Sequence, residues 1–459
     1  MNILSFENVT YTYPNQKESA LREVTFQVKK GESVFITGKS GSGKSTIARA
    51  ITGIIPHIIG GNFEGEVIVN GKNTRMTTVR ELARDVGYVF QNPESQFFTL
   101  TVDHEISLGP ENLGLNEINK RVEKALRMVG LEDKRYESVF NLSEGEKQKV
   151  AMASQLAMSP ELIVMDEPTS NLDPRATDDF FNILKNLEDK TLILIDHRTY
   201  RVPEIFERII VIDNGKIVED TDCKKLLDAD FRNKYGLRRP ERVFNLNFSR
   251  KRRQKPVLKV LGVSYSYGNG FSLEDMNFEL GEGEVLGIVG PTGSGKTTLA
   301  KLIVGLLKPD KGTIELKGNK GMVMQDPDHQ LFMDTVEREL TFGLEDDKLP
   351  FVEDIMESMN LQHLKRRHPH SLSGGEKQRT LISVFLVKKP NVLIMDEPTT
   401  GMDLDNMKRL VNWIKKLKSM GLSLIIISHD LEFLDMVVDN VLILQKGRQK
   451  SADISSIFN

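Results

Sequence analysis

The chain has 459 residues, of which 39% are hydrophobic and 28% are charged, a length that allows roughly two to four domains. This composition excludes the collagen-like, low-complexity and disordered classes of protein. A formal net charge of −3 argues against a globally basic nucleic-acid binder, and the apolar runs are too short to cross a bilayer. The lone Cys223, and a start that lacks a basic and apolar leader, indicate a reducing cytoplasm.

Taken in chain order, short apolar runs alternate with helical patterns. Alternating hydrophobicity predicts a small antiparallel sheet from residues 6–13 and 63–70. Continuous apolar runs are typical of parallel strands covered on both faces, and they occur at 34–38, 162–166, 192–196, 285–290, 392–396 and 424–428. Helices are expected at 45–53, 120–129, 174–187 and 405–418. The predicted fold class is therefore α/β, with a mainly parallel sheet.

The two halves of the chain repeat the same motifs in the same order. In the second half VTYTYPN recurs as VSYSYGN, GKSGSGKST as GPTGSGKTT, LSEGEKQ as LSGGEKQ, and LIVMDEPTSNLD as VLIMDEPTTGMD. We therefore predict one domain at 1–230, a second at 257–459 and a connector at 231–256. The connector holds ten basic residues and one acid. It is either a solvated tether or an electrostatic contact centred on RKRRQK at 250–255.

Each half contains a glycine-rich loop that follows an apolar strand and precedes a helix. Such loops cradle phosphates with backbone N–H groups and a helix N-terminus. The first loop consists of Gly38, Lys39, Ser40, Gly41, Ser42, Gly43, Lys44 and Ser45, followed by Thr46. The second consists of Gly290, Pro291, Thr292, Gly293, Ser294, Gly295, Lys296 and Thr297, followed by Thr298. The lysines would reach the β- and γ-phosphates, and Ser45 and Thr297 are placed to bind Mg²⁺.

Acidic pairs end an apolar strand in each half, where burial disfavours an acid that has no cation to meet. These are Asp166 with Glu167, and Asp396 with Glu397. The first acid of each pair would hold Mg²⁺, and the second would polarise the attacking water. Glu167 and Glu397 could instead cap the following helix. The histidines at the next strand ends, His197 and His429, either orient the γ-phosphate and water or are ordinary strand-end residues.

With LSEGEKQ and LSGGEKQ in place, both halves resemble the ATP-binding cassette (ABC) superfamily. The resemblance implies two tandem P-loop nucleotide-binding domains, each with a parallel core, a small antiparallel β subdomain and a helical subdomain. It also implies two composite ATP sites. One would join Lys44, Gln91, Asp166, Glu167 and His197 to Ser373, Gly374 and Gly375; the other would join Lys296, Gln325, Asp396, Glu397 and His429 to Ser143 and Gly145.

The same resemblance assigns further residues to these sites. Gln91 and Gln325 would take part in binding Mg²⁺ and in hydrolysis, and Asp173 and Asp403 resemble the family's cross-interface loop. Tyr13 and Tyr267 match the aromatic residue that stacks on adenine. Tyr11 and Tyr265 lie on the same strand face, so either pair could simply pack.

Glu144 stands at a position that is usually glycine in this superfamily. Its carboxylate would repel a triphosphate by roughly 4 kcal/mol at about 4 Å, for an effective dielectric near 20, unless the side chain turns to solvent. We therefore expect the site that combines Lys296 with the Glu144-bearing motif to close less readily.

The segment after Gln91 and Gln325 resembles that of the ATPases of energy-coupling factor (ECF) transporters, the cobalt- and vitamin-type importers. It reads FQNPESQFFTLTVDHEISLG in one half and MQDPDHQLFMDTVERELTFG in the other. The resemblance implies that this stretch docks a transmembrane coupling protein, which works with a small substrate-capture protein. Phe97, Phe98, Leu331 and Phe332 are the candidate contacts, although all four could instead pack in the core.

We therefore expect an ATP-hydrolysing subunit at the cytoplasmic face of the membrane, which powers uptake of a vitamin, a vitamin precursor or a metal ion. The alternative is a soluble twin-cassette ATPase that acts on the ribosome and uses the basic connector to bind RNA. The connector disfavours that alternative, because Gly236, Pro240 and Pro256 prevent a long helical hairpin.

Overall fold

The computed structural model describes residues 1–187, 189–241, 255–268, 270–325, 327–344, 349–372 and 374–450. The chain divides into two compact units, Met1–Arg242 with Asp403–Asp405 and Val243–Met402 with Asn406–Asn459. Among the described residues, no helix combines the length and the apolar character that crossing a membrane requires.

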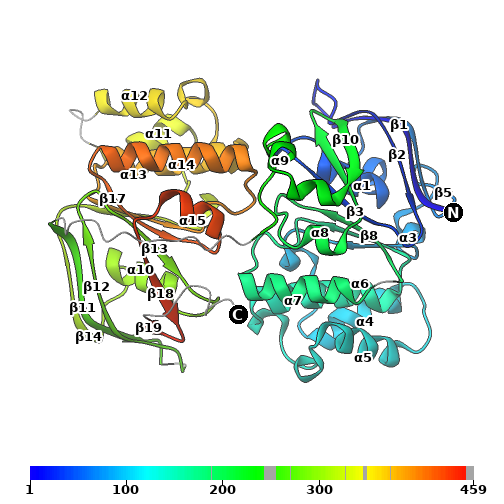
Figure 1. Ribbon diagram of the computed structural model, residues 1–459, viewed down its shortest axis with the longest axis horizontal. Coiled ribbons are helices and arrows are strands. Elements are labelled where there is room, and N and C mark those ends of the chain that lie inside the picture. Colours follow the sequence, from blue (N-terminus) through cyan, green and yellow to red (C-terminus); the bar gives the residue numbers. More distant parts are fainter. Residues whose placement is uncertain are drawn as a thin grey trace. The chain divides into compact units, whose positions relative to one another are not determined.

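The first unit contains two sheets (Figure 1). The antiparallel sheet has the order β2-β1-β4-β5 and consists of β1 (Asn2–Thr12), β2 (Leu21–Lys29), β4 (Asn62–Val69) and β5 (Lys72–Asn73). The other sheet has the order β10-β9-β3-β8-β7-β6 and is parallel except for the β9–β10 hairpin. Its strands are β3 (Ser33–Gly38), β6 (Val86–Val89), β7 (Leu162–Asp166), β8 (Thr191–Ile195), β9 (Arg208–Asp213) and β10 (Lys216–Asp222).

Helices connect these strands. They are α1 (Lys44–Ile51), α2 (Ile54–His57), α3 (Val79–Leu82), α4 (Val102–Asn112), α5 (Ile118–Val129), α6 (Glu144–Met158), α7 (Pro174–Lys185), α8 (Val202–Ile205) and α9 (Ala229–Tyr235). Short 3₁₀ turns lie at Pro93–Gln96, Glu132–Lys134, Val139–Asn141 and Cys223–Leu227.

The central strands are buried on both faces. Alternate side chains of a strand point to opposite sides of the sheet, and here each side enters a separate core. Ile163 and Met165 of β7 enter one core, which also contains residues of α4, α5, α6 and α7. Leu162 and Val164 enter a second core, formed with α1 and the antiparallel sheet. This two-sided burial explains why these strands read as continuous apolar runs.

The second unit repeats the plan with all its strands joined in one sheet, in the order β14-β11-β12-β19-β18-β13-β17-β16-β15. The antiparallel and parallel parts meet where Glu274 of β12 pairs with Arg448 of β19. The strands are β11 (Pro256–Ser266), β12 (Ser272–Gly281), β13 (Val285–Val289), β14 (Lys311–Leu316), β15 (Lys320–Val323), β16 (Val392–Asp396), β17 (Ser423–Ile427), β18 (Asn440–Gln445) and β19 (Arg448–Lys450).

The helices of this unit are α10 (Lys296–Val304), α11 (Val336–Thr341), α12 (Leu349–Ser358), α13 (Gly374–Leu386), α14 (Leu404–Ser419) and α15 (Leu431–Val437). Its 3₁₀ turns lie at Pro327–His329, Gln362–Leu364 and Pro369–Ser371. The predicted α/β class, with mainly parallel sheets and a smaller antiparallel part in each half, is confirmed.

The start of the expected connector requires a correction. Phe231 and Tyr235 lie in α9 and pack against the first core, and Leu237 and Arg238 are buried. These residues therefore belong structurally to the first unit, where Phe231, Tyr235 and Leu237 have apolar partners. Of the basic motif 250–255, residues 250–254 lie outside the described part of the chain.

Candidate functional site

The first expected phosphate loop, residues 38–45, leaves the carboxyl end of β3 and enters α1. Gly43 has φ +105°, and a Cβ there would lie 2.4 Å from the carbonyl oxygen of Ala20. The second loop, residues 290–297, makes the same turn between β13 and α10, with Gly295 at φ +103°. Glycine is required at both positions, since only glycine tolerates this φ and this close approach. Each turn thereby sets a helix N-terminus beyond a strand end, a geometry that suits phosphate.

The lysine of each loop is folded back into its own turn. Lys44 Nζ donates hydrogen bonds to the carbonyl oxygens of Gly38 at 3.0 Å and Lys39 at 2.8 Å. Lys296 Nζ does the same with Gly290 at 2.8 Å and Pro291 at 3.0 Å. Burial lowers the pKa of Lys44, while the charge of Glu167 opposes this shift. An anion in the loop would therefore meet an ammonium group that is already positioned and partly desolvated.

Oxygen groups suited to Mg²⁺ converge beside each loop. Ser45 Oγ donates to Asp166 Oδ1 at 3.1 Å, and Thr297 Oγ1 donates to Asp396 Oδ2 at 2.8 Å. Burial, followed by the charge of Glu167, raises the pKa of Asp166 to about 6. Hydroxyl and carboxylate oxygens are the ligands that Mg²⁺ prefers, so the residues present fit this ion.

The predicted carboxylate and histidine pairs are brought together. His197 Nε2 lies 3.2 Å from Glu167 Oε1, and His429 Nε2 lies 3.4 Å from Glu397 Oε1. Both glutamates have φ +47°, which is a strained backbone for a residue with a side chain. The neighbouring strand holds them there, because the N–H of Glu167 donates to Ile195 O at 2.7 Å and that of Glu397 to Ile427 O at 2.8 Å.

The capping alternative does not describe Glu167. The N-cap of α7 is Asp173, whose Oδ1 accepts a hydrogen bond from the N–H of Ala176 at 2.8 Å. Gln91 Nε2 instead donates to Glu167 Oε2 at 2.9 Å, so this glutamine joins the first site. Gln325 is exposed after β15.

α6 begins within LSEGEKQ, and its first turn carries a reciprocal cap. Ser143 Oγ accepts a hydrogen bond from the N–H of Glu146 at 3.4 Å, while the N–H of Ser143 donates to Glu146 Oε2 at 2.8 Å. This capping box gives Glu146 a structural role. In the second unit Gly374 and Gly375 open α13, and Ser373 lies outside the described residues.

Glu144 is partly compensated by a lysine of its own helix, which it shares with Glu94. Lys147 Nζ lies 2.9 Å from Glu144 Oε1 and also contacts Glu94. The repulsion expected between Glu144 and a triphosphate was that of a carboxylate without an ion-pair partner. Because the structure supplies the neighbouring ammonium, the penalty attributed to Glu144 is smaller than the isolated charge suggests.

Tyr11 of β1 and Tyr13, just beyond the end of β1, differ in their surroundings. Tyr11 is fully buried and its hydroxyl donates to Gly60 O at 2.5 Å, so it packs. Tyr13 is half-buried, with its hydroxyl 3.1 Å from Thr46 Oγ1 and accepting from Arg49 Nη1 at 2.8 Å. In the second unit the hydroxyl of Tyr267 lies 3.4 Å from Thr298 Oγ1. Both candidate adenine-stacking residues therefore lie beside the helix that follows the loop.

Sequence reasoning missed two supporting residues in the first unit. Tyr88 donates to Asp166 Oδ2 at 3.2 Å, and Arg49 joins Tyr13. Neither residue belongs to a motif, and Met322 takes the place of Tyr88 in the second unit. No sequence signal therefore pointed to them.

The four candidate docking residues differ in exposure. Phe98 and Phe332 are 82% and 75% exposed, whereas Phe97 is partly buried against the first core. The expectation for Leu331 is wrong, because its side chain is 1% exposed and belongs to the interior. The second residue of each apolar pair is thus the one that is largely exposed to a partner.

A buried glutamate fixes each exposed phenylalanine, a feature that sequence reasoning also missed. Glu105 Oε2 accepts from the N–H groups of Phe98 at 3.0 Å and Thr99 at 2.8 Å. Glu339 Oε2 accepts from those of Phe332 at 3.0 Å and Met333 at 2.7 Å. The available signal was an acid three residues after the TV dipeptide in both halves.

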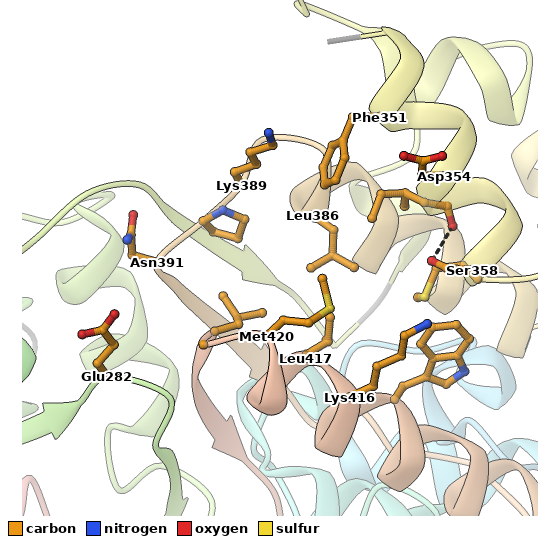
Figure 2. Close-up of a pocket in the computed structure, with 16 residues that line it drawn as sticks. Glu282, Phe351, Asp354, Ser358, Leu386, Lys389, Asn391, Lys416, Leu417 and Met420 are labelled. Atoms are coloured by element: carbon orange, nitrogen blue, oxygen red, sulfur yellow. Dashed lines mark hydrogen bonds between the residues drawn. The ribbon is translucent and has the colours of Figure 1, made fainter. Parts of the chain in front are cut away.

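A separate cavity of about 540 Å³ lies in the second unit, away from its phosphate loop (Figure 2). Phe351, Leu386, Leu417 and Met420 supply apolar walls, and Lys389 Nζ stands 4.5 Å above the Phe351 ring. The cavity also includes Asn391, just before β16, and so lies at the amino end of that strand. The phosphate loop follows the carboxyl end of β13, so this cavity is not the expected nucleotide site.

Comparisons with known proteins agree with this geometry. A family model described as ABC transporter matches residues 21–170 and 273–400. A Treponema denticola protein with the provisional name ABC transporter ATP-binding protein is 36% identical over 469 residues, covering 97% of this chain and 96% of that protein. A Methanosarcina acetivorans protein of the same provisional name is 34% identical over 516 residues, covering 96% and 84%.

Among solved structures, the complex of archaeal ribosomal stalk protein aP1 with archaeal ribosome recycling factor aABCE1 matches with a TM-score of 0.69. That match has 22% sequence identity and covers 96% of this chain and 89% of the other. At this identity the likeness concerns the fold.

Proposed function

Because this chain belongs to the ABC transporter family of ATP-binding proteins, we propose that it is the ATPase subunit of an ECF-type importer. ABC ATPase domains bind ATP with Mg²⁺, and two of them are fused here. In this proposal their ATP-driven closure powers uptake of a vitamin, a vitamin precursor or a metal ion. Separate membrane subunits, a coupling protein and a substrate-capture protein, would carry the cargo.

The chemistry proposed for each site follows from its side chains. Lys44 and Lys296 would exchange their loop carbonyl partners for phosphate oxygens. Mg²⁺, when bound, neutralises charge on the phosphates. Glu167 and Glu397 would accept hydrogen bonds from the attacking water and draw away its proton, while His197 and His429 hold those carboxylates in place. The pairing of each site with the signature motif of the other cassette stays a prediction.

The observation that carries the import proposal is the exposure of Phe98 and Phe332 at matched positions of the two halves. A single exposed phenylalanine is ordinary on a protein surface, so the proposal draws on the recurrence of this residue at matched positions of the two halves. The buried carboxylates of Glu105 and Glu339 accept hydrogen bonds from the backbone N–H groups of these phenylalanines. Two equivalent apolar projections suit two equivalent pockets on a membrane partner.

Membrane pull-down and uptake assays with Phe98→Ala and Phe332→Ala test this proposal. We expect both variants to keep ATP hydrolysis in the isolated chain and to lose co-purifying integral membrane proteins. Met76→Ala is the matched control, because Met76 is 88% exposed in the turn that follows β5. Undiminished membrane capture by the double phenylalanine variant would contradict the proposal.

The alternative, a soluble ATPase that acts on the ribosome, draws on the fold shared with the archaeal recycling factor. The same experiment separates the two functions. Co-sedimentation of the chain with ribosomes, independent of Phe98 and Phe332, would favour the alternative.

A further inference from the structure

An ion pair that fastens two helices in the first cassette is replaced by two like charges in the second. Lys149 of α6 lies 2.9 Å from Asp179 of α7. The motifs LSEGEKQ and SNLD recur 230 positions later as LSGGEKQ and TGMD, so Lys149 corresponds to Arg379 and Asp179 to Arg409. The position that holds an acid in the first cassette therefore holds a second arginine in the second cassette, beside Arg379.

The two guanidinium groups line one cavity of about 280 Å³ between α13 and α14. Amide side chains of Asn360, Gln378 and Asn406 also line it. Within the described part of the chain, neither Arg379 nor Arg409 forms an ion pair of 4 Å or less. The cavity thus concentrates hydrogen-bond donors and positive charge.

The side chain of Arg379 lacks part of its hydrogen bonding. Its Nε is buried and has no hydrogen-bond partner among the described residues. Burial lowers the pKa of Arg379, Glu376 on the same helix opposes that shift, and Arg409 adds to it. Leaving a guanidinium N–H buried without an acceptor is costly, and a bound oxyanion would remove that cost.

We propose that Arg379 and Arg409 form a binding site for a small phosphate- or carboxylate-bearing anion, which bridges α13 and α14 in place of the missing acid. Two guanidinium groups match the oxygens of such an anion with paired, charge-assisted hydrogen bonds. The cavity is slightly smaller than typical drug-sized sites of about 300–1,000 Å³, which favours a compact anion over a nucleotide.

This site adjoins the machinery expected for ATP. Gly375, a residue of the signature motif, lines the same cavity, and Arg379 follows it by one turn of α13. Occupancy would hold α13 against α14, as the Lys149–Asp179 pair does in the first cassette. In the first cassette the corresponding positions hold the Lys149–Asp179 pair, so the proposed site belongs to the second cassette. The proposal does not depend on which cargo the protein serves.

The chain carries a reporter for this site. Trp413 is the only tryptophan in the sequence, and it lines the proposed anion cavity. It also borders the larger apolar cavity of Figure 2, as does Met359. Its emission is therefore expected to change when an anion draws Arg379 and Arg409 together.

The test is a titration of the full chain followed by Trp413 fluorescence. Mg²⁺ and ADP are kept saturating, so that the phosphate loops are filled. Inorganic phosphate is one probe and citrate the other, each compared with chloride at equal ionic strength. We expect a saturable response to at least one probe, and the ratio of the two affinities distinguishes phosphate from carboxylate ligands.

Arg409→Asp restores the charge pattern of the first cassette and should weaken anion binding at least tenfold. Arg409→Gln, which removes the charge without adding an acid, should weaken it in the same direction and serves if the aspartate variant folds poorly. Lys408→Asp is the matched control, because Lys408 is exposed on the same helix and does not line the cavity. The control should bind as the wild type does.

Equal anion affinity in the wild type and both Arg409 variants would overturn the proposal. So would the absence of a saturable response to either anion in the wild type, including the case in which only an acidic protein partner produces a response.

Discussion

Gly145 and Gly375 occupy the same place in the two signature motifs but have different surroundings. A Cβ on Gly145 would lie 2.8 Å from Ala176 Cβ at the start of α7, well inside ordinary contact distance. A Cβ on Gly375 would meet only Arg379 Nη1, at 3.8 Å. We therefore predict that Gly145→Ala destabilises the first unit and that Gly375→Ala does not destabilise the second.

The magnitudes follow from two opposing effects. Overpacking typically costs about 1–3 kcal/mol, whereas replacing a helical glycine by alanine contributes about 1 kcal/mol of stability. Gly145→Ala should thus lower the free energy of unfolding by up to about 2 kcal/mol. Gly375→Ala should leave it unchanged or raise it by about 1 kcal/mol.

Urea unfolding can resolve the two units, because Trp413 fluorescence follows only the second, whereas circular dichroism follows both. Gly145→Ala should move the dichroism midpoint without moving the fluorescence midpoint. Adding Ala176→Gly removes the clashing Cβ, so a double-mutant cycle should show favourable coupling. If Gly145→Ala is as stable as Gly375→Ala, or if Ala176→Gly restores nothing, the packing argument is wrong.

Other expected outcomes follow from the site geometry. Glu397→Gln should reduce ATP turnover by about 10²–10⁴-fold and accumulate ATP-loaded protein, measured by phosphate release and nucleotide retention; ordinary turnover would remove Glu397 from its proposed role. Ser45→Ala, which removes a candidate Mg²⁺ ligand, should raise the Mg²⁺ concentration needed for half-maximal activity, whereas a change confined to maximal rate would argue against metal binding. Burial raises the pKa of Cys223 to about 12, so its thiol should resist iodoacetamide in the folded chain at pH 9 and react on unfolding. Because the pKa of Cys223 is higher in the folded chain than in the unfolded chain, its contribution to the free energy of unfolding is fully present below the ordinary pKa of a thiol and declines as the pH rises toward 12. Rapid labelling of the folded protein would contradict the buried position of Cys223.

Much of the site was legible in the sequence because its determinants are local. The turn at Gly43 needs a glycine conformation, and the strand ending at Asp166 is a continuous apolar run followed by acids. Internal repetition supplied the rest, since the same residue types recur at matched spacing. The α/β class, the phosphate loops and the carboxylate–histidine pairs followed from these patterns.

Tertiary structure decided which side chains are compensated and which are exposed. Adjacent phenylalanines Phe97 and Phe98 read alike in sequence, but Phe97 packs partly against the first core, whereas Phe98 is largely exposed and its N–H is bound by Glu105. Similarly, the effect of the Glu144 charge depends on the neighbouring Lys147. The packing of α13 against α14 is what places Arg409 and Arg379 in one cavity. Spacing along the chain identifies chemical groups, whereas the balance of charge and burial around each group is a property of neighbours that are distant in sequence.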